Sequence, residues 1–151
     1  MLFHLSQHSF FEKGFPKTTG PELFNLTYIE NALIQAGIES LSHYDVMATL
    51  NRFSAITIVD AVKRTIDNHA PISIYTSGGG MHNPLLMEHI QSMLTGCTFH
   101  STEMLKINPD AKEAVLFAIL ANESVAGGNI QIGKTNSGIP SVSMGKISFP
   151  N

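Results

Sequence analysis

Three consecutive glycines at 78–80 lie between a strand pattern and a helix pattern, and this arrangement constrains the fold more than any other sequence feature. Residues 72–76 are rich in β-branched and aromatic side chains, which predicts a short strand. Asn83-Pro84 predicts a helix start, because asparagine is a good N-cap and proline suits the first helical position. The helix pattern ends at Leu94, and residues 97–100 form a second strand pattern. We therefore expect a β-α-β unit with parallel strands and a right-handed crossover.

Helical spacing of apolar residues predicts three further helices, so the expected fold class is helix-rich α/β. These patterns cover residues 21–36, 42–69 and 110–123. The second pattern is apolar over a wide arc and the third is almost continuously apolar, so we expect both helices to be mostly buried. Residues 1–20 lack periodicity and contain glycine and proline, which indicates an extended lead-in or linker. Residues 142–149 are expected to add a short strand.

Composition and charge exclude several classes of protein. The formal net charge is −3 and the basic residues do not cluster, so we expect no nucleic-acid partner. The longest apolar runs, such as residues 114–121, are far shorter than the roughly 20 residues that cross a bilayer. The first residues do not resemble a secretion signal, which indicates a cytoplasmic protein with no membrane partner. The single cysteine, Cys97, excludes an intramolecular disulfide and a CxxC metal site.

The glycine run is also the best candidate for a binding site. Without Cβ atoms, the backbone at the carboxyl end of a strand can adopt a positive φ or approach a ligand closely. The carboxyl ends of the strands are where nucleotides bind in open α/β sheets. The spacing is not that of a dinucleotide fingerprint, and a tight turn without a ligand remains an equal alternative. The candidate cofactor-binding residues are Gly78, Gly79, Gly80 and Asn83.

Other motifs are less specific. Residues 128–135 match the GxxxxGK[ST] phosphate-loop pattern, but a helix pattern precedes them and Pro140 follows closely, so a chance match is favoured. His4 and His8 lack a carboxylate in a metal-ligand pattern, and we predict no metal ligands. His82 could touch a ligand in the glycine turn, although such a side chain is more often only solvated. Cys97 is expected to be a small core residue.

Glu113 lies in the first turn of the helix predicted over residues 110–123. A carboxylate at this position complements the helix dipole, which is the favoured role. It could also orient a substrate hydroxyl, and it is therefore the candidate substrate-binding residue.

Several segments together resemble the C-terminal part of anhydro-N-acetylmuramic acid kinase. The resemblance covers nearly the whole chain in order, and its two most specific segments are Pro16-Lys17-Thr18-Thr19-Gly20 and the stretch from Gly78 to Met87. It continues through Ser101-Thr102 and Glu113-Ala114 to Met144-Gly145-Lys146-Ile147. The motif gives no individual role to Lys17 or Thr19.

The resemblance implies a partial RNase H-like lobe of the actin-like ATPase superfamily, with residues 21–151 as the adenosine-side lobe. Such kinases use ATP and magnesium to open the 1,6-anhydro ring of a murein-derived amino sugar with water and to phosphorylate it in peptidoglycan recycling. The glycine turn resembles the family's adenosine-binding element, and Glu113 matches a glutamate on the substrate side.

The phosphate-binding loop and the catalytic aspartate of such kinases have no match in this sequence. The aspartates that could serve, Asp45, Asp60, Asp67 and Asp110, all lie on predicted helices. We therefore assign no catalytic residue and expect a fragment of the enzyme. The alternatives are a non-catalytic binding or assembly module of the same fold and, less favoured, a phosphate-loop NTPase.

The low charge content indicates either an unusually large core or a surface that is partly covered by something else, and the resemblance implies the second. Charged residues make up 14% of the chain, compared with roughly 25% in an ordinary domain. We expect an apolar face larger than the few hundred Å² usual for a monomer. Either a second copy in a homodimer or a missing N-terminal part would cover it.

Overall fold

A computed structural model describes residues 1–66, 71–126 and 148–149 of the chain. They divide into two compact units, one formed by residues 1–75 and 79–100, the other by residues 76–78 and 101–151. The phosphate-loop match at 128–135 lies outside the described residues, as do residues 142–147 of the strand expected over 142–149.

The predicted β-α-β unit is present in the first unit. Its elements are β1 (Ile72–Thr76), α4 (Pro84–Met93) and β2 (Cys97–Ser101), and the two strands form a parallel sheet. The hydroxyl groups of Ser73 and Thr98 lie 3.1 Å apart across the strands. A short 3₁₀ helix, η2 (Gly79–His82), which the sequence analysis does not anticipate, connects the glycine turn to α4.

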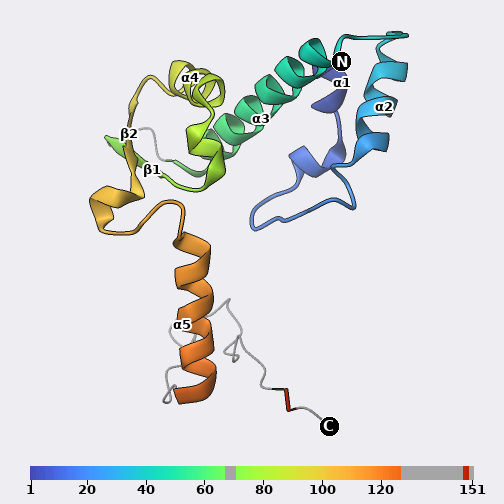
Figure 1. The fold of residues 1–151 in the computed structure, drawn as a ribbon. Helices are drawn as coiled ribbons and strands as arrows, with labels where there is room; N and C mark the ends of the chain where they lie inside the picture. Colours follow the sequence, from blue (N-terminus) through green and yellow to red (C-terminus); the bar gives the residue numbers. More distant parts are fainter. Residues whose placement is uncertain (67–70, 127–147, 150–151) are drawn as a thin grey trace. The chain divides into compact units, whose positions relative to one another are not determined.

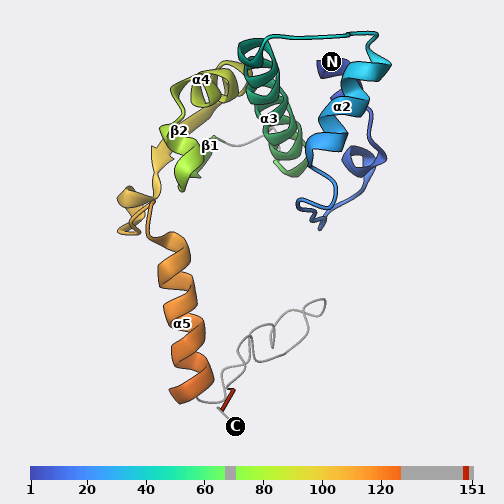
Figure 2. The same cartoon turned by 45° about the vertical axis from the view of Figure 1, so that its right-hand side comes forward.

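The long helix α3 (His43–Thr65) lies between the two core clusters of the first unit, with α4 and the sheet on one side and α1 and α2 on the other (Figures 1 and 2). The cluster near the sheet is built from Ala55 and Val59 of α3 together with Ile90 and Leu94. The other is built from Leu5, Ala32 and Phe53. The expectation that this helix is mostly buried is wrong, because only three of its residues are buried and several large apolar ones are exposed.

Residues 1–20 are not the extended lead-in expected from the sequence. They contain α1 (Leu2–Leu5) and the 3₁₀ helix η1 (Ser9–Glu12). Leu5 is fully buried, and its carbonyl oxygen accepts a hydrogen bond from the Tyr28 hydroxyl. Arg64 of α3 donates a 2.7 Å hydrogen bond to the carbonyl oxygen of Phe11 and forms an ion pair with Asp60. Tertiary contacts therefore order a segment too short to show helical periodicity.

The helix predicted over residues 21–36 begins five residues later, as α2 (Leu26–Gln35). The side chain of Asn25 caps it by accepting a 3.1 Å hydrogen bond from the amide of Tyr28. An asparagine cap at the helix start thus decides the boundary, whereas Pro21 lies in the preceding turn.

In the second unit, the 3₁₀ helix η3 (Thr102–Leu105) precedes α5 (Lys112–Ala126). The expectation that this last helix is buried is wrong for the chain as described, since α5 contains no buried residue and Phe117 is 67% exposed. Within residues 1–66, 71–126 and 148–149, no helix is both long and apolar enough to cross a membrane.

Candidate functional site

The glycine turn after β1 has one residue with a left-handed backbone. Gly78 has a φ of +81°, a conformation that side chains disfavour, and its amide donates a 2.9 Å hydrogen bond to the carbonyl oxygen of Pro109 within the second unit. Of the two possibilities that the missing Cβ atoms allow, a positive φ or a close approach to a ligand, Gly78 shows the first. The φ angles of Gly79 and Gly80 are not positive.

Neither of the next two glycines is required by the chain's own packing. A Cβ added at Gly79 would meet no heavy atom within 4 Å, and one added at Gly80 would make only an ordinary 3.7 Å contact with Leu86. The fold alone could accommodate alanine at both positions. A missing Cβ that the fold does not need leaves room for a close approach from outside the chain.

The start of α4 offers few amide donors to a ligand. Asn83 accepts a 3.1 Å hydrogen bond from the amide of Leu86 through its side-chain oxygen, and Pro84 has no N–H group. At most one of the first three helical positions, Leu85, can therefore present an amide. Phosphate binding at a helix N-terminus relies on several such amides, so this turn fits the uncharged part of a ligand better than a phosphate group.

Glu113 lies in the first turn of α5, as predicted, where its carboxylate complements the helix dipole. It belongs to the second unit, whereas Gly79, Gly80 and Asn83 belong to the first.

Thr102, also in the second unit, is a feature that the residue patterns do not reveal. It is 8% exposed, and its side-chain oxygen has no hydrogen-bond partner among the described residues.

Lys17 binds the backbone of residues that precede it in the sequence. Its ammonium group donates hydrogen bonds of 3.0 and 3.1 Å to the carbonyl oxygens of Phe10 and Phe11. The same nitrogen lies 4.9 Å from the ring centre of Phe10 and 5.2 Å from that of Phe15, which adds cation–π attraction. These contacts give Lys17 a structural role that the sequence motif does not specify.

Thr19 and Gly20 bind a carboxylate of their own segment. The Thr19 hydroxyl and the Gly20 amide both donate to Glu22, at 3.1 and 2.6 Å. Hydrogen bonds from the amides of Glu22 itself and of Gly20 lower the pKa of the Glu22 carboxyl below its ordinary value of 4.5, and the Thr19 hydroxyl adds to the effect. The motif around Lys17 therefore builds a closed loop before α2.

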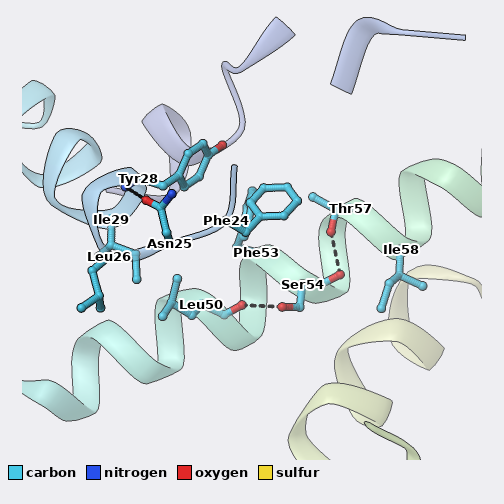
Figure 3. A pocket seen from close by; sticks show the side chains of 10 residues that line it. All are labelled: Phe24, Asn25, Leu26, Tyr28, Ile29, Leu50, Phe53, Ser54, Thr57 and Ile58. Carbon is cyan, nitrogen blue, oxygen red and sulfur yellow. Dashed lines mark hydrogen bonds between the residues drawn. The ribbon is translucent and has the colours of Figure 1, made fainter. Parts of the chain in front are cut away.

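A groove of about 680 Å³ lies between α2, the residues before it, and α3 (Figure 3). Its walls are mainly apolar side chains, and its lining consists of Phe24, Asn25, Leu26, Tyr28, Ile29, Leu50, Phe53, Ser54, Thr57 and Ile58.

The polar side chains in this groove are already hydrogen-bonded within the chain. The hydroxyls of Ser54 and Thr57 donate to the carbonyls of Leu50 and Ser54, at 2.9 and 3.0 Å (Figure 3). Asn25 caps α2, and the Tyr28 hydroxyl donates to a backbone carbonyl. The groove therefore suits an apolar partner rather than a sugar or a nucleotide.

The remaining candidates have local roles. The side-chain nitrogen of His8 accepts from the amide of Phe10, and Cys97 is half-buried against the core cluster near the sheet. Within the described part of the chain, no group of three or more His, Cys, Asp or Glu side chains could hold a metal ion.

Comparison with known proteins adds independent information. The sequence model of the anhydro-N-acetylmuramic acid kinase family matches residues 1–149. The kinase of that name from Pseudoalteromonas atlantica is 51% identical over 152 positions, which cover 100% of this chain and 38% of the relative. That from Pseudoalteromonas translucida is 47% identical over 99% of this chain and 37% of the relative. That from Caldanaerobacter subterraneus is 34% identical over 98% of this chain and 38% of the relative. The chain thus spans less than two fifths of the length of these relatives.

Proposed function

Because the chain belongs to the anhydro-N-acetylmuramic acid kinase family, we propose that it supplies the adenosine-side contacts of an ATP-dependent kinase. The reaction opens the anhydro ring of 1,6-anhydro-N-acetylmuramic acid with water and phosphorylates the sugar in peptidoglycan recycling. Within that reaction, this chain binds the base and ribose of ATP, and the groups that handle the phosphates belong to the part of the relatives that it does not match.

The observation that carries this proposal is the open space at Gly79. Gly96 has the same open space, but Gly79 follows the carboxyl end of β1, where nucleotides bind in open α/β sheets, so a ligand can pack against its backbone. A nucleoside fits because its base is flat and uncharged, and because the start of α4 has at most one free amide for a phosphate.

Magnesium would reach the site together with ATP. Hard cations such as Mg²⁺ prefer carboxylate and carbonyl oxygens, and residues 1–66, 71–126 and 148–149 bring no three carboxylate, histidine or cysteine side chains together. The described residues therefore would not hold Mg²⁺ through protein side chains alone, and the phosphates of ATP would supply the remaining ligands.

The Gly79→Ala variant tests the nucleoside site, with Gly96→Ala as its matched control. Both glycines have open space around a new Cβ and neither has a positive φ, so both variants should fold as the wild type does. We expect Gly79→Ala to weaken adenosine binding about tenfold, because a methyl group forced into a close contact costs about 1–3 kcal/mol. Isothermal titration with adenosine measures the effect. Equal affinities in all three proteins would overturn the proposal.

Phosphoryl transfer needs the rest of the enzyme. We expect this chain, supplied with MgATP and the anhydro sugar, to give no phosphorylated product. Addition of the unmatched part of the Pseudoalteromonas atlantica relative should restore product formation. Absence of product in both reactions, with each protein folded, would contradict the assignment.

Glu113 is the proposed substrate-side residue, where its carboxylate accepts a hydrogen bond from a sugar hydroxyl. In the complemented enzyme, Glu113→Gln should raise the KM for the sugar and leave the KM for ATP unchanged. An unchanged KM for the sugar would leave Glu113 with only its role at the helix dipole.

A second candidate function, favoured by the apolar groove, is an assembly module of the same fold. In this form a second copy of the chain, or the part of the relatives that this chain does not match, covers the groove between α2 and α3. Leu26→Glu tests it, because Leu26 lines the groove and is 76% exposed, so a charge there should not disturb the core. Light scattering should show a dimer for the wild type and a monomer for the variant. A monomeric wild type would exclude the homodimer.

The proposals for the detailed fold and for the cellular location rest on the same family membership. We propose that residues 21–151 form part of an RNase H-like lobe of the actin-like type and that the protein acts in the cytoplasm. The parallel β1–α4–β2 unit supports the first assignment, and cell fractionation tests the second.

A further inference from the structure

Asn83 joins the glycine turn to α4 through three hydrogen bonds. Its backbone amide donates to the carbonyl oxygen of Gly80 at 3.1 Å, and its own carbonyl oxygen accepts from the amide of Met87 at 3.1 Å. Its side-chain oxygen accepts from the amide of Leu86, also at 3.1 Å. The residue is therefore hydrogen-bonded both to Gly80, the last glycine of the run, and to the first turn of α4.

The side-chain bond fixes the orientation of the whole carboxamide. Because an amide group is planar, an oxygen held by Leu86 also determines the direction of the NH₂ group. The helix start depends on this bond, since Pro84 cannot donate and the Leu86 amide would otherwise lack an acceptor. Asn83 therefore stabilises both the start of α4 and its connection to the glycine turn.

We infer that Asn83 is a positioning residue, which holds Gly79 and Gly80 in place for the nucleoside without touching it. This inference rests on the proposed nucleoside site. It changes the role of Asn83 from a ligand contact to a cap that acts through the backbone of the turn.

The chain contains a matched control for this role. Asn25 caps α2 in the same way, with its side-chain oxygen 3.1 Å from the amide of Tyr28. Loss of either cap should lower the stability of the protein to a similar extent. Only the cap at Asn83 lies next to the glycine turn.

The experiment compares Asn83→Ala, Asn83→Ser, Asn83→Asp and Asn25→Ala in the full chain. Serine and aspartate retain an oxygen that can cap the helix, whereas alanine does not. Two measurements are made on each protein: amide hydrogen exchange without ligand at position 83, whose amide donates to the Gly80 carbonyl oxygen, and titration with adenosine. Adenosine carries no charge, so the aspartate does not repel it.

We expect Asn83→Ala to speed exchange at position 83, because the loss of the cap loosens the helix start, and to weaken adenosine binding about five-fold, the factor that corresponds to a lost helix cap. Serine and aspartate should restore both properties, and Asn25→Ala should change neither. If serine and aspartate restore slow exchange but not affinity, Asn83 contacts the ligand and the inference is wrong. Unchanged exchange in Asn83→Ala would also overturn it.

The two proposals fail in different ways. If the wild-type chain does not bind adenosine, the proposed nucleoside site is wrong. The exchange rate of the amide at position 83 still shows whether the Asn83 side chain holds the turn.

Discussion

The ammonium group of Lys17 donates a 3.0 Å hydrogen bond to the carbonyl oxygen of Phe10, seven residues earlier in the chain. A second hydrogen bond, to the carbonyl oxygen of Phe11, also connects Lys17 and the loop before α2 to η1. We expect Lys17→Met to lower the free energy of unfolding by about 1–2 kcal/mol, because two partly buried carbonyls lose a charged donor. Urea unfolding measures the change. Lys13→Met is the control, since Lys13 is exposed, and a loss of equal size there would contradict this role.

Leu5 makes the N-terminal segment part of the folded unit. Its side chain is fully buried against Ala32 and Phe53, so Leu5→Ala should cost about 2–5 kcal/mol through lost packing and a cavity. Phe3 in the same short helix is 67% exposed, and Phe3→Ala should change stability by only about 0.5 kcal/mol. Thermal unfolding of both variants decides whether α1 is structurally necessary, and a small effect for Leu5→Ala would refute it.

Gly78 is the one residue of the glycine run whose backbone demands glycine. Gly78→Ala should destabilise the protein by about 1–2 kcal/mol, because a Cβ is strained at a φ of +81°. Gly78→Asn should cost less, since asparagine tolerates the left-handed region better than other side chains. Chemical denaturation of the two variants gives this order, and a reversed order would contradict the strain argument.

The loop before α2 should respond to acid through Glu22. Hydrogen bonds to the carboxylate lower its pKa in the folded state, so the group contributes stability above pH 4.5 that is lost as the pH falls through its lowered folded-state value. An NMR titration of the Glu22 side chain should give a midpoint below 4.5. Glu22→Gln, which cannot ionise, should differ most from the wild type at neutral pH. A difference in stability that does not shrink with falling pH would oppose this assignment.

The elements that could be predicted from the sequence are those with local signals. Asn83 and Pro84 place the start of α4 at the correct residue, because the cap and the proline act within one turn. The same pair of residue types at 108–109 is less informative. Asn108 accepts hydrogen bonds from the amides of Asp110 and Ala111, which makes a turn, and α5 begins at Lys112.

The elements that could not be predicted depend on distant contacts. The short helix α1 is stabilised by the burial of Leu5 among residues from α2 and α3, which no local pattern encodes. The glycines of the candidate site could be predicted from residue type, but not that Gly78 alone has a positive φ. The role of Lys17 could not be predicted either, because its hydrogen-bond acceptors are backbone carbonyls, which every residue has.

The contact between Arg64 and the carbonyl of Phe11 has a consequence for the order of folding. The two residues are 53 positions apart, and Tyr28 and Leu5 are 23 apart, so both bonds close long loops. Loop closure costs entropy before a contact forms, and Arg64 must be in place on α3 before it can bind Phe11. Synthesis on the ribosome delivers the N-terminal residues first. We nevertheless expect them to become ordered late, after α3 has emerged and formed.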